Sequence, residues 1–130
     1  MKVFEQLIRV EPQHIDGLQH VNNVVYVQWV QNIAEAHWNS LAPDEIKKRY
    51  AWVVVRHEIE YLSPAFLYDV LRARTWVAES AGARSVRKVE IYRQSDGRKM
   101  ITASTTWCLL DAATGKPRRI ETDILKLFHA

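Results

Sequence analysis

The chain has 130 residues, 48% of them hydrophobic, with four glycines and four prolines. This length predicts one domain over residues 1–130, and the composition excludes a largely disordered protein. The net charge of +3 would suit an anionic partner, but no nucleic-acid-binding motif accompanies it, so we expect no nucleic-acid partner. Cys108 is the only cysteine, so we expect no intrachain disulfide and a cytoplasmic location. Neither a signal peptide nor a run near the ~18 apolar residues that cross a membrane is present, so we expect no membrane partner.

The first third of the sequence predicts a strand, a loop and one long helix. Residues 3–10 are mostly apolar around a few polar positions and predict the first strand. Residues 11–23 contain a proline, a glycine and a cluster of polar side chains, which predict a loop long enough to carry function. Residues 26–41 place apolar side chains three and four positions apart, which predicts a helix with Asn22 or Asn23 as its N-cap.

After Tyr50 the sequence predicts five further strands joined by short turns. In the first of these strands, one face is expected to carry Val53, Val55, His57, Ile59 and Tyr61. The others are expected over residues 69–79, 84–93, 99–110 and 118–127. Short turns join antiparallel neighbours, and a helix with an apolar face must cover a sheet, so the sequence predicts an α+β fold with an antiparallel sheet of five to six strands wrapped around one long helix. The open edge or face of such a sheet predicts a dimer.

The segment from Asp16 to Tyr26 reads Asp-Gly-Leu-Gln-His-Val-Asn-Asn-Val-Val-Tyr and leads into the predicted helix. It places a carboxylate, an imidazole and the carboxamides of two adjacent asparagines within eight residues. The helix N-terminus beside them offers unpaired backbone N–H groups and the positive end of the helix dipole, which can bind an anion or polarise a carbonyl oxygen. Thioester cleavage needs little more, because the thiolate is a good leaving group and no strong general acid is required. The segment therefore offers the groups that thioester hydrolysis needs, with Asp16 available as general base or nucleophile.

The run Asp-x-x-x-His-Val-Asn-Asn-x-x-Tyr at the start of a long helix resembles the 4-hydroxybenzoyl-CoA thioesterase-like branch of the hotdog superfamily. Plant acyl-carrier-protein thioesterases carry a similar run. The order of predicted elements is similar to that family over nearly the whole chain, and residues 61–64 also look like a family feature. The resemblance implies a single hotdog domain that hydrolyses an acyl-CoA, or an acyl group on acyl carrier protein, without a cofactor.

The resemblance also implies roles for individual residues. Asp16 matches the family's catalytic aspartate, and His20 matches a histidine that holds the loop in place. Asn23 stands where some relatives carry a histidine, so we expect Asn23 to orient water and a backbone N–H at or after it to act as the oxyanion donor. Further substrate contacts are expected from Asn22, Tyr26, Tyr61 and Ser63. Family members place their active sites at a subunit boundary, which implies a homodimer or a homotetramer of two dimers.

Basic side chains gather on the third and fourth predicted strands. Among them Arg84, Arg87 and Lys88 are candidates to bind the phosphates of CoA, because guanidinium and ammonium groups form charge-assisted hydrogen bonds with phosphate. The alternative is that they form an ordinary solvated strand face. No spacing of His, Cys, Asp or Glu resembles a metal site, so no metal is expected.

Two other functions are compatible with the same pattern. A hotdog hydratase or dehydratase also uses an acidic residue and a histidine, but its motif places Asn-Pro between them, where this chain has Leu18 and Gln19. A non-catalytic module that binds acyl-CoA is the third interpretation, and the presence of both Asp16 and Asn23 argues against it.

Overall fold

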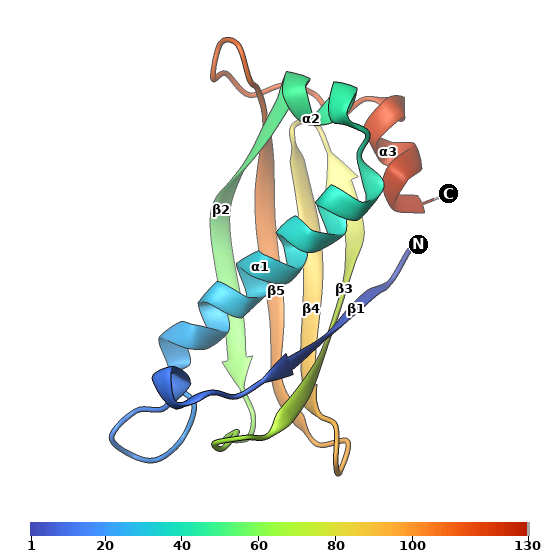
Figure 1. Cartoon of the computed structure of the whole chain (residues 1–130). Helices are drawn as coiled ribbons and strands as arrows, with labels where there is room; N and C mark the ends of the chain where they lie inside the picture. The colour runs from blue at the N-terminus through green and yellow to red at the C-terminus, as the bar shows by residue number, and fades with distance from the viewer. Residues whose placement is uncertain (130) are drawn as a thin grey trace.

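The computed structural model describes residues 1–129, which form one antiparallel sheet and a long helix that crosses it (Figure 1). In sheet order, the strands are β1 (Phe4–Arg9), β3 (Val70–Ala81), β4 (Arg84–Arg93), β5 (Lys99–Asp111) and β2 (Tyr50–Tyr61). The helices are α1 (Asn23–Leu41), α2 (Asp44–Arg49) and α3 (Thr122–His129), and the short 3-10 helix η1 covers Pro12–His14. The expected α+β fold is confirmed, with five strands in the sheet.

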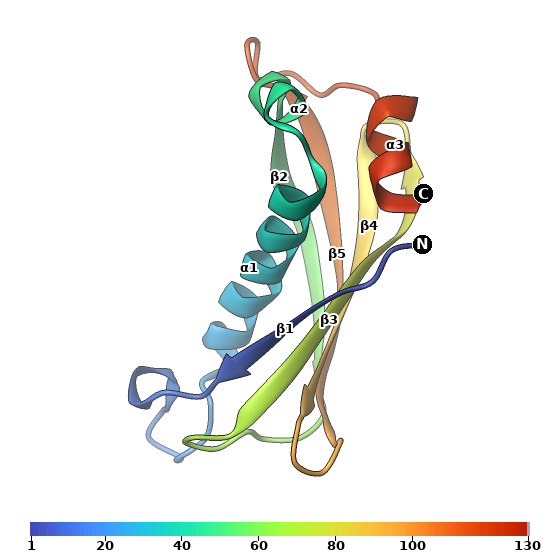
Figure 2. The same ribbon diagram turned by 45° about the vertical axis from the view of Figure 1, so that its right-hand side comes forward.

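Helix α1 crosses the sheet because of the order of the strands. β1 lies at one edge of the sheet and β2 at the other, and α1 belongs to the segment that joins them. Figures 1 and 2 show α1 running obliquely over one face. Its buried side chains recur at helical spacing: Tyr26, Trp29, Val30, Ile33, Ala34 and His37. The predicted amphipathic helix is confirmed, and it begins earlier than residue 26 because Asn22 caps it.

Strand β2 changes face part-way along its length. Its register with β5 shifts at Val55, which is the extra residue of a β-bulge. Before the bulge, Trp52 packs against the core and Val53 is 41% exposed. After the bulge, His57 bonds toward α1 and Ile59 packs against the core. The prediction that Val53 and Val55 share a face with His57 is therefore wrong, because the extra residue inverts the alternation of side chains.

The last segment is helical, and the prediction of a sixth strand over residues 118–127 is wrong. Ile120, Ile124 and Phe128 are buried at intervals of one helical turn. They belong to a second core cluster that closes the end of the sheet where α1 finishes. The Lys2 N–H donates to the Phe128 carbonyl at 3.0 Å, so the beginning of the chain is tied to α3.

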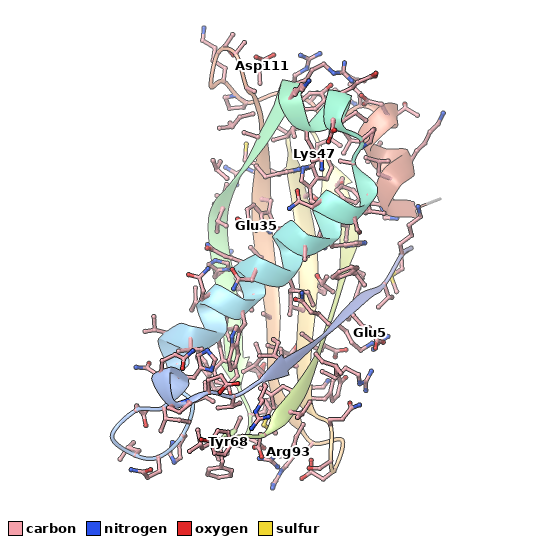
Figure 3. All side chains as sticks on the ribbon, viewed as in Figure 1. Glu5, Glu35, Lys47, Tyr68, Arg93 and Asp111 are labelled. Carbon is pink, nitrogen blue, oxygen red and sulfur yellow. The ribbon has the colours of Figure 1, made fainter. Side chains whose placement is uncertain are left out.

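The two ends of the sheet carry different structures (Figure 3). Asp111 marks the end where α2 and α3 lie, and Tyr68 and Arg93 mark the opposite end, beside the beginning of α1. The larger core cluster packs between the first half of α1 and the sheet, and the second cluster lies under α2 and α3. The two ends of α1 therefore pack in different core clusters.

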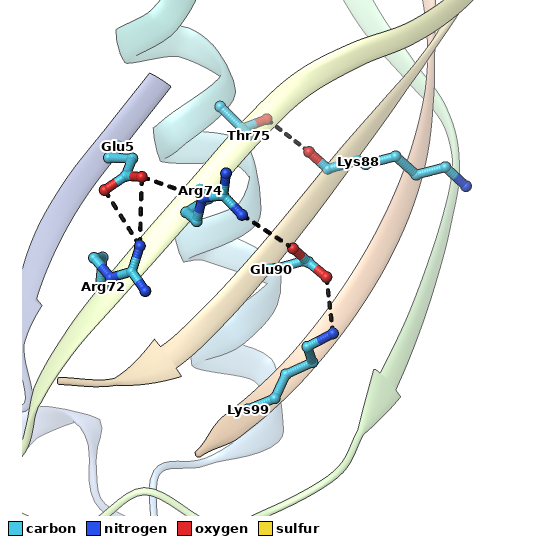
Figure 4. Close-up of polar contacts among 7 residues, drawn as sticks. All are labelled: Glu5, Arg72, Arg74, Thr75, Lys88, Glu90 and Lys99. Carbon is cyan, nitrogen blue, oxygen red and sulfur yellow. Dashed lines mark hydrogen bonds and ion pairs between the residues drawn. The ribbon is translucent and has the colours of Figure 1, made fainter. Parts of the chain in front are cut away.

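The sheet face that points away from α1 is charged (Figure 4). Glu5 accepts hydrogen bonds from Arg72 at 3.4 Å and from Arg74 at 3.1 Å. Glu90 accepts from Lys99 at 2.8 Å and lies 3.6 Å from Arg74. Partial burial disfavours the charged form of Glu90, but the bond from Lys99 and the nearby Arg74 lower its pKa overall. Exposed ion pairs stabilise a fold by only about 0–1 kcal/mol each, so this network defines the outer face more than it holds the fold together.

We predict that Ile124→Ala lowers the free energy of unfolding by about 2–5 kcal/mol, because it removes a fully buried side chain and leaves a cavity. Chemical denaturation measures the change. Lys126→Ala, on the exposed face of the same helix, is the matched control and should change the value by no more than about 0.5 kcal/mol. Equal effects of the two substitutions would contradict the packing of α3.

Candidate active site

A tight hairpin places Asp16 shortly before α1. Ile15 and Val21 form an antiparallel bridge, and the Asp16 N–H donates to the His20 carbonyl at 2.9 Å. Gln19 closes the turn with a positive φ of 68°, a conformation that few residues other than glycine adopt. The backbone therefore fixes Asp16 opposite His20 at the base of the turn.

The Asp16 carboxylate is half-buried and is held by the same turn. Its Oδ1 accepts hydrogen bonds from the Leu18 N–H at 2.9 Å and, with a longer contact, from the His20 N–H at 3.4 Å. Its Oδ2 receives no hydrogen bond within residues 1–129. One oxygen thus orients the group, while the other is free to accept a proton or to attack an electrophile.

One backbone N–H at the start of α1 has no acceptor. The Asn22 N–H donates to the His14 carbonyl at 2.9 Å. The Val24 N–H donates to Asn22 Oδ1 at 3.0 Å, and the Val25 N–H donates to the Asn22 carbonyl at 2.9 Å. The Asn23 N–H lies between them and finds no partner in the described part of the chain. Because Asn23 is the first helical residue, this donor stands at the positive end of the helix dipole and is available to an external oxygen.

Two tyrosines support the helix start. The Tyr61 hydroxyl donates to the Asn23 carbonyl at 3.2 Å, and the rings of Tyr61 and Tyr26 pack edge to face with centroids 5.8 Å apart. Tyr26 is 2% exposed, and its hydroxyl makes no contact of full hydrogen-bond geometry within residues 1–129. Burial raises the pKa of Tyr26 to about 12, so this side chain remains a neutral hydroxyl at pH 7.

Exposed apolar side chains surround this polar group, and we call them the apolar rim. They are Leu18, Val24, Tyr61, Leu62 and Phe66, which are between 44% and 72% exposed. The Val21 N–H donates to the Ala65 carbonyl at 2.9 Å, which joins the hairpin to the loop after β2. An apolar patch beside polar groups is typical of a surface that binds an apolar ligand or another chain.

Arg93 holds the loop that carries part of the rim. Its Nε donates to Asp69 Oδ2 at 3.0 Å, and its Nη2 donates to the Pro64 carbonyl at 2.7 Å. The guanidinium also lies 5.7 Å from the centre of the Phe66 ring. Charge-assisted hydrogen bonds of this kind are stronger than neutral ones, so they fix the loop over the end of the sheet.

The structure gathers the hairpin and helix-start candidates at one end of the molecule. They lie on the hairpin, on the first turn of α1 and around the end of β2: Asp16, His20, Asn22, Asn23, Tyr26, Tyr61 and Ser63. His20 contributes its backbone to the turn, while its ring packs edge-on to the Phe66 ring at 6.0 Å. These placements bring a carboxylate, a free N–H and an apolar surface to one end of α1.

The three basic candidates do not converge. Arg84 begins β4 at its turn from β3, and its side chain is exposed. Arg87 points inward and is 4% exposed. Lys88 points to the outer face, where its Nζ donates to Ser104 Oγ at 3.2 Å. Successive residues of a strand point to opposite faces, so Arg87 and Lys88 cannot meet one ligand within this chain.

The sequence matches the family model described as the Thioesterase-like superfamily over residues 10–128, which is most of the chain. The chain belongs to this superfamily. The family predicted from the hairpin motif is confirmed, and so is the prediction of an enzyme that hydrolyses thioesters.

Relatives agree with this assignment. The long-chain acyl-CoA thioesterase FadM of Escherichia coli K12 is 28% identical over 122 residues, which are 90% of this chain and 90% of FadM. YbaW, a probable thioesterase from Escherichia coli, is 26% identical over 95% of this chain and 94% of its own, with a TM-score of 0.81. A 4-hydroxybenzoyl-CoA thioesterase is 14% identical over 98% and 99% of the two chains and shares the fold with a TM-score of 0.86. The predicted hotdog fold is therefore confirmed.

Two histidines of this thioesterase have partners that the sequence does not reveal. The Glu11 N–H donates to His14 Nδ1 at 2.9 Å, beside the hairpin. His57 lies 3.3 Å from the Gln31 amide nitrogen and 2.9 Å from Thr105 Oγ1. Because an amide NH₂ only donates, His57 Nε2 accepts from Gln31 and Nδ1 carries the proton toward Thr105. Burial lowers the pKa of His57, which agrees with this neutral form.

A third histidine, His37, is buried in contact with a buried cation. Arg87 Nη1 donates to His37 Nδ1 at 2.8 Å, and the His37 ring stacks on Phe4 at 5.2 Å. Burial, together with the charge of Arg87, lowers the pKa of His37 to about 4. One signal in the sequence could have shown that Arg87 points inward, since it shares its strand parity with Val89 and Ile91.

The polar group at the helix start is an open site in the single chain. Asp16 and Asn23 line neither the cavity beside the second half of α1 nor the hollow on the outer face of the sheet. Within residues 1–129, no cluster of three or more His, Cys, Asp or Glu side chains is placed to hold a metal. In the same range, the helices are too short or too polar to span a bilayer.

We predict that His37 makes the protein less stable in acid. Its pKa is 6.5 in an unfolded chain and about 4 in the folded protein. Between these values only the unfolded chain binds the proton, so the free energy of unfolding should fall by roughly 3 kcal/mol in all as the pH decreases from 6.5 to 4. His37→Gln retains an acceptor for Arg87 and does not titrate, so it should flatten this dependence. Denaturation at several pH values checks the prediction, and an unchanged slope in the variant would contradict it.

Proposed function

We propose that this thioesterase hydrolyses acyl-CoA at the start of α1 and releases a free acid and CoA. The observation that carries the proposal is the unpaired N–H of Asn23 close in sequence to an Asp16 carboxylate that the adjoining hairpin holds by one oxygen. The apolar rim offers a surface for the acyl group. A hydrogen-bond donor, a base and an apolar contact are together what hydrolysis of an acyl thioester requires.

In the proposed reaction, the Asn23 N–H donates to the thioester carbonyl oxygen and stabilises the negative charge that develops there. Asp16 Oδ2 either removes a proton from the attacking water or attacks the carbonyl carbon to form an anhydride that water then hydrolyses. The C–S bond breaks and CoA leaves as a thiolate, which needs no strong acid. The Asn23 carboxamide orients water, and His20 maintains the hairpin.

The remaining contacts are proposed around this centre. Asn22, Tyr26, Tyr61 and Ser63 are proposed to line the bound thioester. The phosphates of CoA are proposed to meet Lys88, whose side chain lies on the outer face, whereas Arg87 points into the interior and Arg84 lies toward the end of the sheet that carries Asp111. Because FadM is named a long-chain acyl-CoA thioesterase, fatty acyl-CoA is the first substrate class to test. We propose that the reaction takes place in the cytoplasm, without a cofactor, in one hotdog domain over residues 1–130.

We predict that Asp16→Asn lowers kcat/KM for acyl-CoA hydrolysis by about 10²–10⁴-fold, because the amide cannot act as a base or nucleophile. Its Oδ1 still accepts the hydrogen bonds from Leu18 and His20, so the hairpin should keep its shape. Release of free thiol from a panel of acyl-CoA esters measures the effect and also reports the preferred acyl group. A structural neighbour, a 4-hydroxybenzoyl-CoA thioesterase, was solved as an Asp-to-Asn variant with 4-hydroxybenzoyl-CoA bound, a precedent for this substitution.

Asp111→Asn is a matched control for this variant. Asp111 Oδ1 accepts two backbone N–H groups in a turn, from Ala113 at 2.9 Å and Thr114 at 3.1 Å, as Asp16 does in its own turn. It lies at the opposite end of the sheet (Figure 3), so its replacement should leave kcat/KM unchanged. Wild-type turnover by Asp16→Asn would refute the assignment. Loss of enoyl absorbance from crotonyl-CoA without thiol release would instead indicate a hydratase, and binding without either reaction would indicate a non-catalytic module.

We further propose a homodimer formed through β2, with the active site at the subunit boundary. β2 is 12 residues long and pairs only with β5 within the chain, so its other edge carries unpaired backbone groups. Val53 and Val55 are 41% and 44% exposed on this strand. The strand ends at Tyr61, which belongs to the apolar rim, so a second copy paired along β2 would approach the rim. Pairing of two such dimers would give a tetramer.

We predict that the double variant Val53→Lys and Val55→Lys is monomeric and loses most of its thioesterase activity, because charged side chains on an edge strand oppose pairing. Light scattering coupled to size-exclusion chromatography measures the mass. Leu7→Lys on β1 is the matched control, since Leu7 is 61% exposed on the other edge strand and should leave the dimer intact. A double variant that remains dimeric, or a fully active monomer, would overturn the proposal.

A further inference from the structure

A cavity of about 190 Å³ lies between the second half of α1, the sheet and α3. Four aromatic side chains form much of its wall: Trp38, Trp52, Trp107 and Phe128. Its polar lining comes from Glu35, Ser85 and Arg87. Glu35 is exposed on α1 (Figure 3), so the cavity opens along that helix. It contains none of the residues of the helix-start site, so it is a separate candidate for a binding site.

Arg87 is a buried cation without an acidic partner. Its side chain is almost fully enclosed, and no Asp or Glu in residues 1–129 lies within 4.0 Å of the guanidinium. Nη1 donates to His37 Nδ1 at 2.8 Å and to Thr75 Oγ1 at 3.2 Å. The donors on Nε and Nη2 find no acceptor in the described chain, and the side chain lines the cavity. Several N–H groups are therefore available there to an external oxygen.

The groups around Arg87 do not compensate its charge. His37 accepts a hydrogen bond through Nδ1 and is neutral, since its pKa is held near 4. The Thr75 hydroxyl donates its own proton to the Lys88 carbonyl at 2.9 Å, so it too only accepts from Arg87. The Phe128 ring lies 5.8 Å from the guanidinium and offers a weak cation–π contact. Burial lowers the pKa of Arg87 to about 10, which leaves the side chain charged at pH 7.

A second polar group at the cavity is also unpaired. The Trp107 indole N–H is buried without a hydrogen-bond partner, and the Trp107 side chain lines the cavity. A buried charge or donor without a partner costs several kcal/mol of stability in general. Concave apolar sites that contain a few convergent donors are the usual form of a small-molecule site.

We propose that this cavity binds a small carboxylate with an apolar body, whose oxygens accept hydrogen bonds from Arg87. A guanidinium matches a carboxylate in geometry and charge, and Arg87 retains a free edge for it. The aromatic wall suits a ring or a short chain. A cavity of about 150 Å³ in another protein holds benzene, so this one has room for a body on that scale plus part of a polar group. Benzoate and hexanoate are the matching probes.

Such a carboxylate has two sources with the same chemistry. It can be a free acid, as released by thioester hydrolysis, or the distal carboxylate of a dicarboxylic acyl group carried on CoA. The Glu35 carboxylate lines the opening and repels an anion, so it should weaken the binding of either carboxylate. Glu35→Gln should tighten binding if the ligand is an anion.

Direct binding tests the site independently of hydrolysis. Benzoate should quench or shift tryptophan fluorescence of the wild-type protein and raise its Tm, while the neutral isostere benzamide should bind at least tenfold more weakly. Arg87→Met preserves length and removes the charge, so it should lose benzoate binding at least tenfold. Its Tm without ligand shows that the variant is folded, because removal of the buried charge offsets the loss of the hydrogen bonds to His37 and Thr75. Arg87→Lys keeps a charge and should retain the preference for benzoate over benzamide.

Kinetics separate the two sources and rest on the proposed hydrolysis, whereas the binding measurements do not. If the natural ligand is the distal carboxylate of an acyl group, the ratio of kcat/KM for glutaryl-CoA to that for pentanoyl-CoA should fall in Arg87→Met. If the natural ligand is a free acid, this ratio should stay constant while benzoate binding is lost. The inference is overturned if wild-type protein shows no benzoate binding at millimolar concentration. It is equally overturned if benzamide binds as tightly as benzoate, or if Arg87→Met binds benzoate like the wild type.

Discussion

The apolar stripe that α1 buries against the sheet determines where the candidate functional groups of this protein lie. A helix of this length draws most of its stability from such packing, so the contacts of Trp29, Val30 and Ile33 with the sheet also fix both helix ends. At one end, backbone N–H groups emerge beside the hairpin of Asp16. At the other, Trp38 and α3 enclose a cavity over Arg87. One packed helix thus positions two polar environments.

The two environments differ in how far the single chain completes them. At the helix start, capping by Asn22 uses the neighbouring N–H groups and leaves that of Asn23 free. The apolar rim around it stays exposed, which is unfavourable for an isolated surface and favours a covering chain or ligand. At the cavity, Phe128 is buried and the three tryptophans are partly buried, and what remains unmatched is the charge of Arg87. These differences are why we propose a reaction at a subunit boundary for the first environment and an anion for the second.

Much of the fold can be predicted from the periodic spacing of apolar residues. The three- and four-residue spacing of α1 and the alternation along β3, β4 and β5 are direct consequences of backbone geometry. The hairpin could be located because its polar residues lie close together in sequence. By contrast, the bulge at Val55 depends on pairing with β5, which no local pattern reveals. The sequence predicts a sixth strand over residues 118–127 because five strands precede it, although Ile124 and Phe128 lie one helical turn apart in α3.

The basic residues of β4 show a different limit of prediction from sequence. Their closeness in sequence predicts a cluster of basic side chains, but the geometry of the strand separates those side chains. Arg87 and Lys88 are adjacent, so a strand must point them to opposite faces. Arg87 takes the face of Val89 and Ile91, where an apolar side chain would satisfy every local rule of packing. A charge at such a position conflicts with its surroundings, and sites of this kind are where function commonly overrides stability. An anion at the free edge of the guanidinium would remove this conflict, so the carboxylate that we propose would turn an unfavourable charge into a favourable contact.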